Sequence, residues 1–287
     1  MNGNERAILS KGAPLDVVEQ EYEKLTEEEL IGLNTVLGAF RTFRGDRRKH
    51  IAYVSMPITT GKRYYEVLAD NKVNNPKELM EKKGPDALWK LVMQPNIKKG
   101  IAFADRLGTK RDLLFIAPSV FEAKKWRWTQ EAYMSLWYRV IAEMAGCLFM
   151  MDGWEYSTGG VKEFLFSMIL QWKSIRWHNV GEIARNNGWK NFFPDMSYER
   201  KKAELKAMWN IRVFSARGNE IDLYNGLAKI VWAISELKSA RFDYKPLAEV
   251  AECFTNFLLA TTPSMSDAFG CDGFLEIRES LSSLCYA

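Results

Sequence analysis

The chain has 287 residues, enough for one large domain or two smaller ones at about 150 residues per domain. Apolar residues make up 47% and charged residues 26%, a balance typical of globular proteins that excludes disordered, collagen-like and disulfide-scaffold classes. The net charge of +4 is too small to indicate a nucleic-acid-binding surface. Aromatic residues reach 13%, and such side chains both fill cores and line pockets for flat ligands.

The cysteine and histidine pattern predicts neither a metal site nor a disulfide framework. The chain has two histidines, and its four cysteines form no CxxC pair. The beginning of the sequence has no apolar leader, and no apolar run approaches the roughly 18 residues that span a bilayer. We therefore expect a cytoplasmic protein with reduced thiols, no cofactor and no membrane contact.

The first part of the chain predicts a helical preface followed by a strand. Within residues 1–48, Thr26 and Glu29 form a capping-box pattern ahead of apolar residues at helical spacing. A buried strand is expected over 50–56. The next expected segments are a turn over 57–63, a helix from about residue 64, a polar loop over 71–86, and helices at 87–94 and 97–107 that Pro95 separates.

The middle of the chain alternates strands with helices. Strands are expected over 112–117 and 147–151, and helices over 129–145 and from about 160 to 172. Continuous apolar strands are typical of parallel sheets that are covered on both faces. The pattern therefore predicts an α/β fold, a flavodoxin- or Rossmann-like parallel sheet with helices on both faces.

Beyond residue 176 the sequence predicts helices and no strand. Ser197 is expected to cap a charged helix through about residue 216, which Gly218 ends. Further helices are expected over 220–241, 246–260 and 273–284. The expected organisation is a helical preface (1–48), an α/β domain (49–175) and a helical C-terminal region (176–287).

The loop after the first strand, Met56–Arg63, is one candidate site, because ligands of α/β sheets bind beyond the carboxyl ends of strands. The helix that follows begins with backbone N–H groups that favour anions such as phosphate. An ordinary capped turn with solvated cations is the alternative. The candidate ligand-contacting residues of this loop are Thr59, Thr60, Gly61, Lys62 and Arg63.

A second candidate site follows the strand over 147–151. That strand ends at Asp152, a glycine-rich turn comes next, and Ser157 precedes a helix with Glu163 in its expected first turn. A carboxylate there is stabilised as the anion by about 0.3–1 kcal/mol. An ionised, positioned glutamate can attack an anomeric carbon. Alternatively, Glu163 only complements the helix dipole.

Together the segments AYVSMPITTGKR and LFMMDGWEYSTGGVKE resemble the nucleoside 2-deoxyribosyltransferase-like superfamily, over roughly residues 50–172. That superfamily includes the 2′-deoxynucleoside 5′-monophosphate N-glycosidases. In its members one strand leads into a GPI-like turn. A later strand leads into a GWxxSxGxxxE segment, whose glutamate attacks C1′ of the sugar.

The resemblance implies roles for individual residues. Glu163 takes the place of the nucleophile, Ser157 that of a phosphate-contacting serine, and Gly159 lets the backbone approach the ligand. Tyr53 lies on the first strand, near the sugar. The turn that surrounds sugar and phosphate corresponds to Thr59, Thr60, Gly61 and Arg63, and Lys62 adds a second cation to hold a phosphate.

Two departures from the family pattern bear on catalysis. Met56 stands where relatives carry the first glycine of the turn. Relatives also carry an aspartate that assists proton transfer to the base, and the matching position here is Arg139. Asp152 or Glu155 is the expected replacement acid. If neither acts, the fold binds a nucleotide without cleaving it.

Three functions follow as hypotheses. The first is an N-glycosidase or deoxyribosyltransferase acting on a nucleoside or its 5′-monophosphate. The second is a non-catalytic nucleotide-binding or sensor protein, and the third a glycohydrolase of NAD or a modified nucleotide. The resemblance also implies a homo-oligomer.

The aromatic residues are divided between core and pocket. Core packing is expected for Trp89, Phe103, Tyr133, Trp137, Phe164, Trp172, Trp209 and Trp232. A position around the pocket is expected for Tyr53, Trp126, Trp128, Trp154 and Tyr156. For the three tryptophans of this group, core packing is the alternative.

Overall fold

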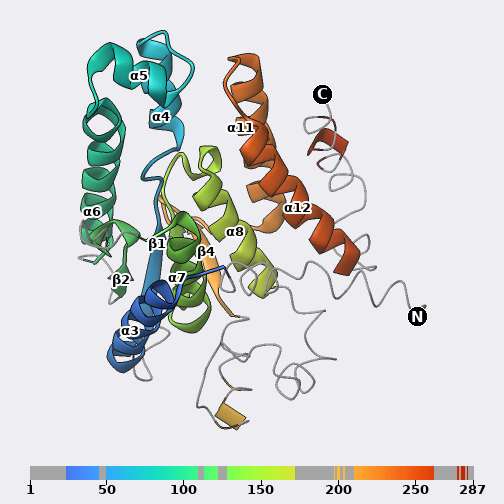
Figure 1. The fold of residues 1–287 in the computed structure, drawn as a ribbon. Helices are drawn as coiled ribbons and strands as arrows, with labels where there is room; N and C mark the ends of the chain where they lie inside the picture. Colours follow the sequence, from blue (N-terminus) through green and yellow to red (C-terminus); the bar gives the residue numbers. More distant parts are fainter. Residues whose placement is uncertain are drawn as a thin grey trace.

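A four-stranded parallel sheet forms the centre of the computed structural model, which describes residues 24–44, 50–108, 113–121, 128–171 and 210–261 and isolated positions within 197–203 and 277–283 (Figure 1). The strand order is β2-β1-β3-β4, and every neighbouring pair is parallel. This confirms the predicted α/β fold. The strands are β1 (Ile51–Ser55), β2 (Leu114–Ile116), β3 (Cys147–Met150) and β4 (Arg212–Ser215).

Helices cover both faces of this sheet, because successive strand residues point to opposite sides. Tyr53 and Leu148 belong to the larger core, and Val54 and Phe149 to a smaller one that includes Phe103. The larger core contains α3 (Glu27–Arg44), α7 (Gln130–Glu143), α8 (Thr158–Gln171), α11 (Leu223–Ser239) and α12 (Lys245–Thr261), and the smaller one α6 (Gln94–Gly108).

The predicted capping residues join two of these helices. Glu29 Oε2 accepts hydrogen bonds from the backbone N–H and hydroxyl of Thr26, both at 3.0 Å, which confirms the capping box of α3. Glu29 Oε1 accepts from the backbone N–H and hydroxyl of Thr129, the N-cap of α7, at 2.9 and 2.7 Å. These donors, the Thr129 backbone N–H above all, lower the pKa of Glu29 to about 2.

The polar stretch over 71–86, expected as a loop, contains the helix α5 (Pro76–Lys83). The Asn75 side chain accepts a hydrogen bond from the backbone N–H of Glu78 at 2.9 Å, and Pro76 occupies the first helical turn. A good cap therefore outweighs the polar composition. The preceding helix, α4 (Lys62–Asp70), starts two residues before the expected Tyr64.

Pro95 does not separate two helices. A π-helical turn over Trp89–Met93 continues directly into α6. Pro95 follows this π turn within one continuous helical segment, so the altered hydrogen-bond pattern of the turn lies next to the residue that has no N–H to donate.

The expectation that no strand follows residue 176 is wrong. β4, inside the expected charged helix, pairs with β3 in register Leu148 to Val213. Val213 is buried and Arg212 exposed, so the strand packs one face on the core at an edge of the sheet. The helices predicted over 220–241 and 246–260 are confirmed as α11 and α12.

Several predictions fall on residues outside those described, including Trp126, Trp172, Trp209 and most of the helices expected over 1–23, 197–211 and 273–284. Within the part of the chain that the structure describes, every helix is too short or too polar to cross a membrane.

Candidate functional site

The candidate site lies where the sheet changes direction. The chain passes from β1 to β2 on one side, and then returns to β3 on the other side of β1. Crevices at such a switch point, beyond the carboxyl ends of the strands, are the usual ligand sites of open α/β sheets. The two segments singled out in the sequence follow β1 and β3, so the topology brings them together.

The loops after β1 and β3 are fixed against each other. The Thr60 hydroxyl donates a hydrogen bond to Ser157 Oγ at 3.0 Å. Gly61 has a φ of 88°, and a side chain there would overlap the Pro57 ring. Gly153, in the second loop, has a φ of 87° and lies against Lys62. Each loop therefore depends on glycine to approach the other.

Asn96 of α6 holds the loop after β1 through side-chain hydrogen bonds. This buried side chain donates from Nδ2 to the carbonyl of Ile58 at 3.1 Å and to that of Thr60 at 3.4 Å. It pairs two backbone carbonyls of a loop that forms neither helix nor strand, and so holds that loop in place. The sequence analysis missed it, because a single amide within an amphipathic helix gives no distinctive signal.

Between these loops and α7 lies a cavity of about 320 Å³. Its polar lining comes mostly from the β1 loop and the first turns of α8, and its apolar lining mostly from α7. Its lining includes Ile58, Thr59, Thr60, Gln130, Tyr133, Met134, Trp137, Ser157, Thr158, Gly159, Lys162 and Glu163.

Glu163 is the carboxylate of this cavity, the single one among the described residues that line it. It is buried, and Tyr53 Oη donates a hydrogen bond to its Oε1 at 2.5 Å. Burial raises the pKa of Glu163 to about 7, against the opposing effect of the Ser55 and Tyr53 hydroxyls. At neutral pH, both protonation states of this carboxyl are therefore populated.

The expectation that Glu163 lies in the first helical turn is wrong. Ser157 Oγ accepts the backbone N–H of Gly160 at 3.4 Å, and α8 begins at Thr158, so Glu163 is its sixth residue. Its environment is set by burial and by Tyr53, and the helix dipole acts mainly on the first turn. A dipole-complementing role therefore does not explain it.

Tyr53, expected near the sugar, is fully buried on β1 and is not among the residues that line the cavity. Its ring packs on Trp137 at 6.0 Å, and burial followed by the neighbouring Glu163 raises its pKa well above the usual range. Tyr53 therefore remains a hydrogen-bond donor, which favours the ionised form of Glu163.

The beginning of α8 has the features of an anion site. Ser157, Thr158 and Gly159 line the cavity at the positive end of the helix, and Lys162 adds a cation one turn later. A Cβ added to Gly159 would meet only Ser157 Oγ, at 3.9 Å, so the folded chain itself does not require glycine there.

The two cations predicted to hold phosphate lie elsewhere. Arg63 is exposed, and its Nε donates to the carbonyl of Leu91 at 2.8 Å. Lys62 is exposed and lies 5.9 Å from the centre of the Tyr156 ring. Neither lines the cavity, whereas Lys162, which the sequence analysis did not select, does.

The two expected replacement acids also lie outside the cavity lining. Asp152 is exposed, and Glu155 is half-buried after the left-handed Gly153 turns the chain away. Burial raises the pKa of Glu155, and the positive charge of Lys229 on α11 opposes this shift. The structure does not bring either acid to Glu163.

The aromatic residues of the second loop belong to the core. Trp154 is buried and packs on Phe164 with ring centres 4.6 Å apart. Tyr156 is buried, and its hydroxyl donates to Glu236 at 2.5 Å. Trp128 is half-buried and packs on Tyr133 at 5.5 Å. The core alternative thus holds for Trp154, which does not line the cavity.

Arg139, at the position of the family's aspartate, is structural. It is buried in α7 and pairs with Glu143 at 3.1 Å. Glu143 also pairs with Arg41 of α3 at 2.6 Å. This ion cluster joins two helices and does not line the cavity.

The cavity face of α7 was missed in the sequence. Gln130, Tyr133, Met134 and Trp137 recur at intervals of three and four residues, the pattern of an ordinary core face. Tyr133 and Trp137 were accordingly expected in the core. Only the position of α7 beside the switch point distinguishes these residues from core residues.

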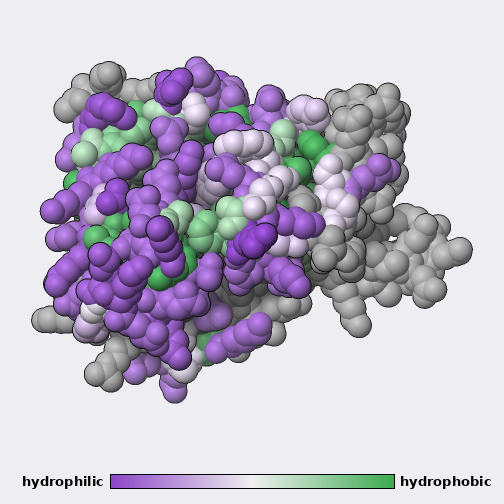
Figure 2. All heavy atoms as spheres, turned by 90° about the horizontal axis from the view of Figure 1, so that it is seen from above, coloured by the Kyte–Doolittle hydropathy of each residue, from purple (hydrophilic) through white to green (hydrophobic). Residues whose placement is uncertain are grey.

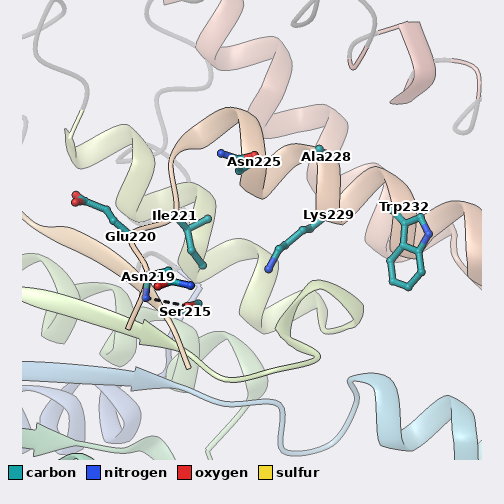
Figure 3. Close-up of a pocket in the computed structure, with 8 residues that line it drawn as sticks. All are labelled: Ser215, Asn219, Glu220, Ile221, Asn225, Ala228, Lys229 and Trp232. Carbon is teal, nitrogen blue, oxygen red and sulfur yellow. Dashed lines mark hydrogen bonds between the residues drawn. The ribbon is translucent and has the colours of Figure 1, made fainter. Parts of the chain in front are cut away.

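A second hollow of about 450 Å³ lies between the turn after β4 and α11 (Figure 3). Several of its polar groups are already paired. The Asn219 backbone N–H donates to Ser215 Oγ at 3.2 Å, Glu220 pairs with Arg212 at 2.5 Å, and Asn225 Nδ2 donates to Asp222 at 2.7 Å. This hollow is therefore the weaker candidate.

The surface seen from above is mostly hydrophilic, with hydrophobic residues in small separate areas (Figure 2). Among the described residues, no group of three or more His, Cys, Asp or Glu side chains could hold a metal ion.

Comparisons of the chain with family models, curated proteins and solved structures find no match.

Proposed function

We propose that this protein cleaves or transfers the N-glycosidic bond of a deoxynucleoside 5′-monophosphate, with Glu163 as the nucleophile. The observation that carries this proposal is the buried Glu163 carboxyl, which lines a cavity at the switch point of the sheet and accepts a hydrogen bond from Tyr53 behind it. Perturbed, buried carboxyls in clefts are typical of functional sites. The resemblance in the sequence supplies the reaction class.

In the proposed reaction, a Glu163 carboxylate oxygen attacks C1′ of the sugar. The C1′–N bond breaks, its electron pair leaves with the base, and a proton from solvent neutralises the base. Water then attacks C1′ of the glycosyl ester, releases the carboxylate and loses a proton to solvent; a second base in place of water gives transfer. Tyr53 holds the carboxylate and keeps its own proton throughout.

The cavity favours a single nucleotide over a dinucleotide. Its volume of about 320 Å³ lies at the lower end of the 300–1,000 Å³ typical of ligand pockets. Hydroxyls, helix N–H groups and Lys162 at one end suit a phosphate. Tyr133, Met134 and Trp137 at the α7 side suit a flat base. NAD is the less suitable substrate on this argument.

The test is base release from a panel of deoxynucleotides, deoxynucleosides and NAD, followed by chromatography. We expect release by the unmodified protein, and loss of at least 10³-fold in Glu163→Gln, since the nucleophile is removed. Glu131→Gln is the matched control, because Glu131 is exposed on the neighbouring α7 and does not line the cavity. Equal release by the Glu163 variant contradicts the mechanism.

A non-catalytic nucleotide-binding protein is the second candidate. The observation that favours it is the absence of a second carboxylate among the described cavity residues, so no side-chain acid assists the leaving base. Calorimetry combined with chromatography distinguishes the two, because a binding protein returns its nucleotide uncleaved. A homo-oligomer stays a prediction, which light scattering checks.

A further inference from the structure

Ser55 is a fully buried hydroxyl beside the proposed nucleophile. It lies at the carboxyl end of β1, two residues after Tyr53, so both side chains point to the same face of the sheet. Tyr53 bonds Glu163 on that face. Ser55 therefore lies next to the carboxyl group, one strand position closer to the loop that forms the cavity.

The Ser55 hydroxyl has no hydrogen-bond partner among the described residues, although it is buried. A buried hydroxyl without a hydrogen-bond partner destabilises the fold, so each one in a folded protein requires an explanation. Ser55 lies near enough to Glu163 to favour its ionised form, and a hydroxyl can rotate to donate. Tyr53 engages only Oε1, which leaves Oε2 free to accept another donor.

We propose that Ser55 is a positioning residue that donates a second hydrogen bond to the Glu163 carboxylate when that group is ionised. This inference rests on the proposed function for its catalytic consequence. With Tyr53 on one oxygen and Ser55 on the other, the carboxylate is fixed in orientation and held ready for attack. Protonation of Glu163 weakens its oxygens as acceptors, so the Ser55 hydrogen bond is strongest when the carboxyl group is ionised.

The catalytic test is the pH profile of base release by Ser55→Ala. We expect kcat at pH 7 to fall on the order of tenfold, because a hydrogen bond to a charged group is lost. We expect the acidic limb of the profile to move upward by on the order of one pH unit, with activity recovered at pH 9. KM should stay unchanged because Ser55 does not line the cavity. Ser55→Thr, which keeps a hydroxyl, should restore the profile.

Ser135→Ala is the matched control. Ser135 lies on α7, is fully buried and has an unpaired hydroxyl like Ser55, but it does not line the cavity. We expect its pH profile to coincide with that of the unmodified protein. A Ser55→Ala profile with the same limb as the control overturns the proposal, whatever the change in rate.

A second measurement does not depend on turnover. The urea concentration at the unfolding midpoint is measured at pH 5 and pH 8 for four proteins: the unmodified protein, Ser55→Ala, Glu163→Gln and the double variant. The effect of Ser55→Ala is then compared with and without the Glu163 carboxyl group. We expect Ser55→Ala to lower the midpoint more at pH 8 than at pH 5 when Glu163 is present, and equally when it is replaced. The same loss at both pH values overturns the pairing. If base release fails in every protein but this pattern appears, the proposed function fails and the Ser55 inference holds.

Discussion

The raised pKa of Glu163 makes a sharp prediction about stability. A folded-state pKa near 7 against the ordinary value of 4.5 means that the folded protein binds this proton more tightly than the unfolded chain. Ionising Glu163 therefore opposes folding, and its contribution becomes less favourable as pH rises from about 4.5 to 7. At about 1.4 kcal/mol per pH unit, the full cost is about 3 kcal/mol above pH 7.

Glu163→Gln removes this cost while it keeps an acceptor for Tyr53. Relative to the unmodified protein, the variant should gain about 3 kcal/mol at pH 8 and less than about 1 kcal/mol at pH 5, apart from a constant offset due to the substitution. Urea unfolding at the two pH values measures this, and the difference in midpoint should be on the order of 1 M. Glu131→Gln, on the exposed side of α7, should change the free energy of unfolding by the same amount at pH 5 and at pH 8.

A stability gain of Glu163→Gln that is equal at pH 5 and pH 8, or larger at pH 5, contradicts a raised pKa of Glu163. Either result means that Glu163 ionises at its ordinary pKa, or below it, in the folded protein. The carboxylate would then be solvated or paired, and the buried Tyr53–Glu163 pair would not describe the folded state.

Three further predictions follow. Gly159→Ala should leave stability unchanged or raise it by up to about 1 kcal/mol, since the new Cβ meets only Ser157 Oγ, yet weaken nucleotide binding at least tenfold by calorimetry; full affinity contradicts the site. Glu155→Gln should change base release less than about twofold, because Glu155 does not line the cavity, and a large loss would make it the acid. Glu29→Gln should cost about 1 kcal/mol of stability at pH 7 in thermal unfolding, because Glu29 bonds the caps at Thr26 and Thr129. That loss should shrink as pH falls from 4.5 toward 2, and a loss independent of pH contradicts the lowered pKa.

The elements that local chemistry specifies could be predicted from the sequence. β1 and β3 are continuous apolar runs, which identify buried parallel strands, and Thr26 and Thr129 cap their helices as expected. β4 could not be predicted, because the charged Arg212 interrupts its apolar residues and the strand depends on pairing with β3. The segment Asn75-Pro-Lys-Glu has the residues of a helix start, but the polar composition of the stretch favoured a loop.

The candidate site also has residues that could be predicted from the sequence and residues that could not. Thr60 and Ser157 lie in the loops after β1 and β3, and Glu163 lies in the helix that the second loop opens, so the rule that ligands lie beyond strand ends places them together. Side-chain direction after a turn is not encoded in this manner, and Lys62 and Glu155 point away from the cavity.

The aromatic residues show most clearly which side-chain positions the sequence could not predict. Core was expected for Tyr133 and Trp137, which line the cavity, and for Trp232, which is 56% exposed. A place beside the pocket was expected for Trp154 and Tyr156, which are buried in the core. Helical periodicity identifies the inner face of a helix, but it does not distinguish a packed interior from a pocket wall.

The position of Glu163 also bears on the choice between catalysis and binding. A cavity that only bound a nucleotide would gain nothing from a buried carboxyl that destabilises the fold when ionised and repels a phosphate nearby. Glutamine at this position would accept from Tyr53 equally well and would carry neither disadvantage. The two disadvantages are understandable if the carboxylate reacts, because stability is often lower where a reactive group is held away from water. Glu163→Gln therefore separates the two functions: it should bind nucleotide more tightly than the unmodified protein in both cases, but lose turnover only if the protein is an enzyme.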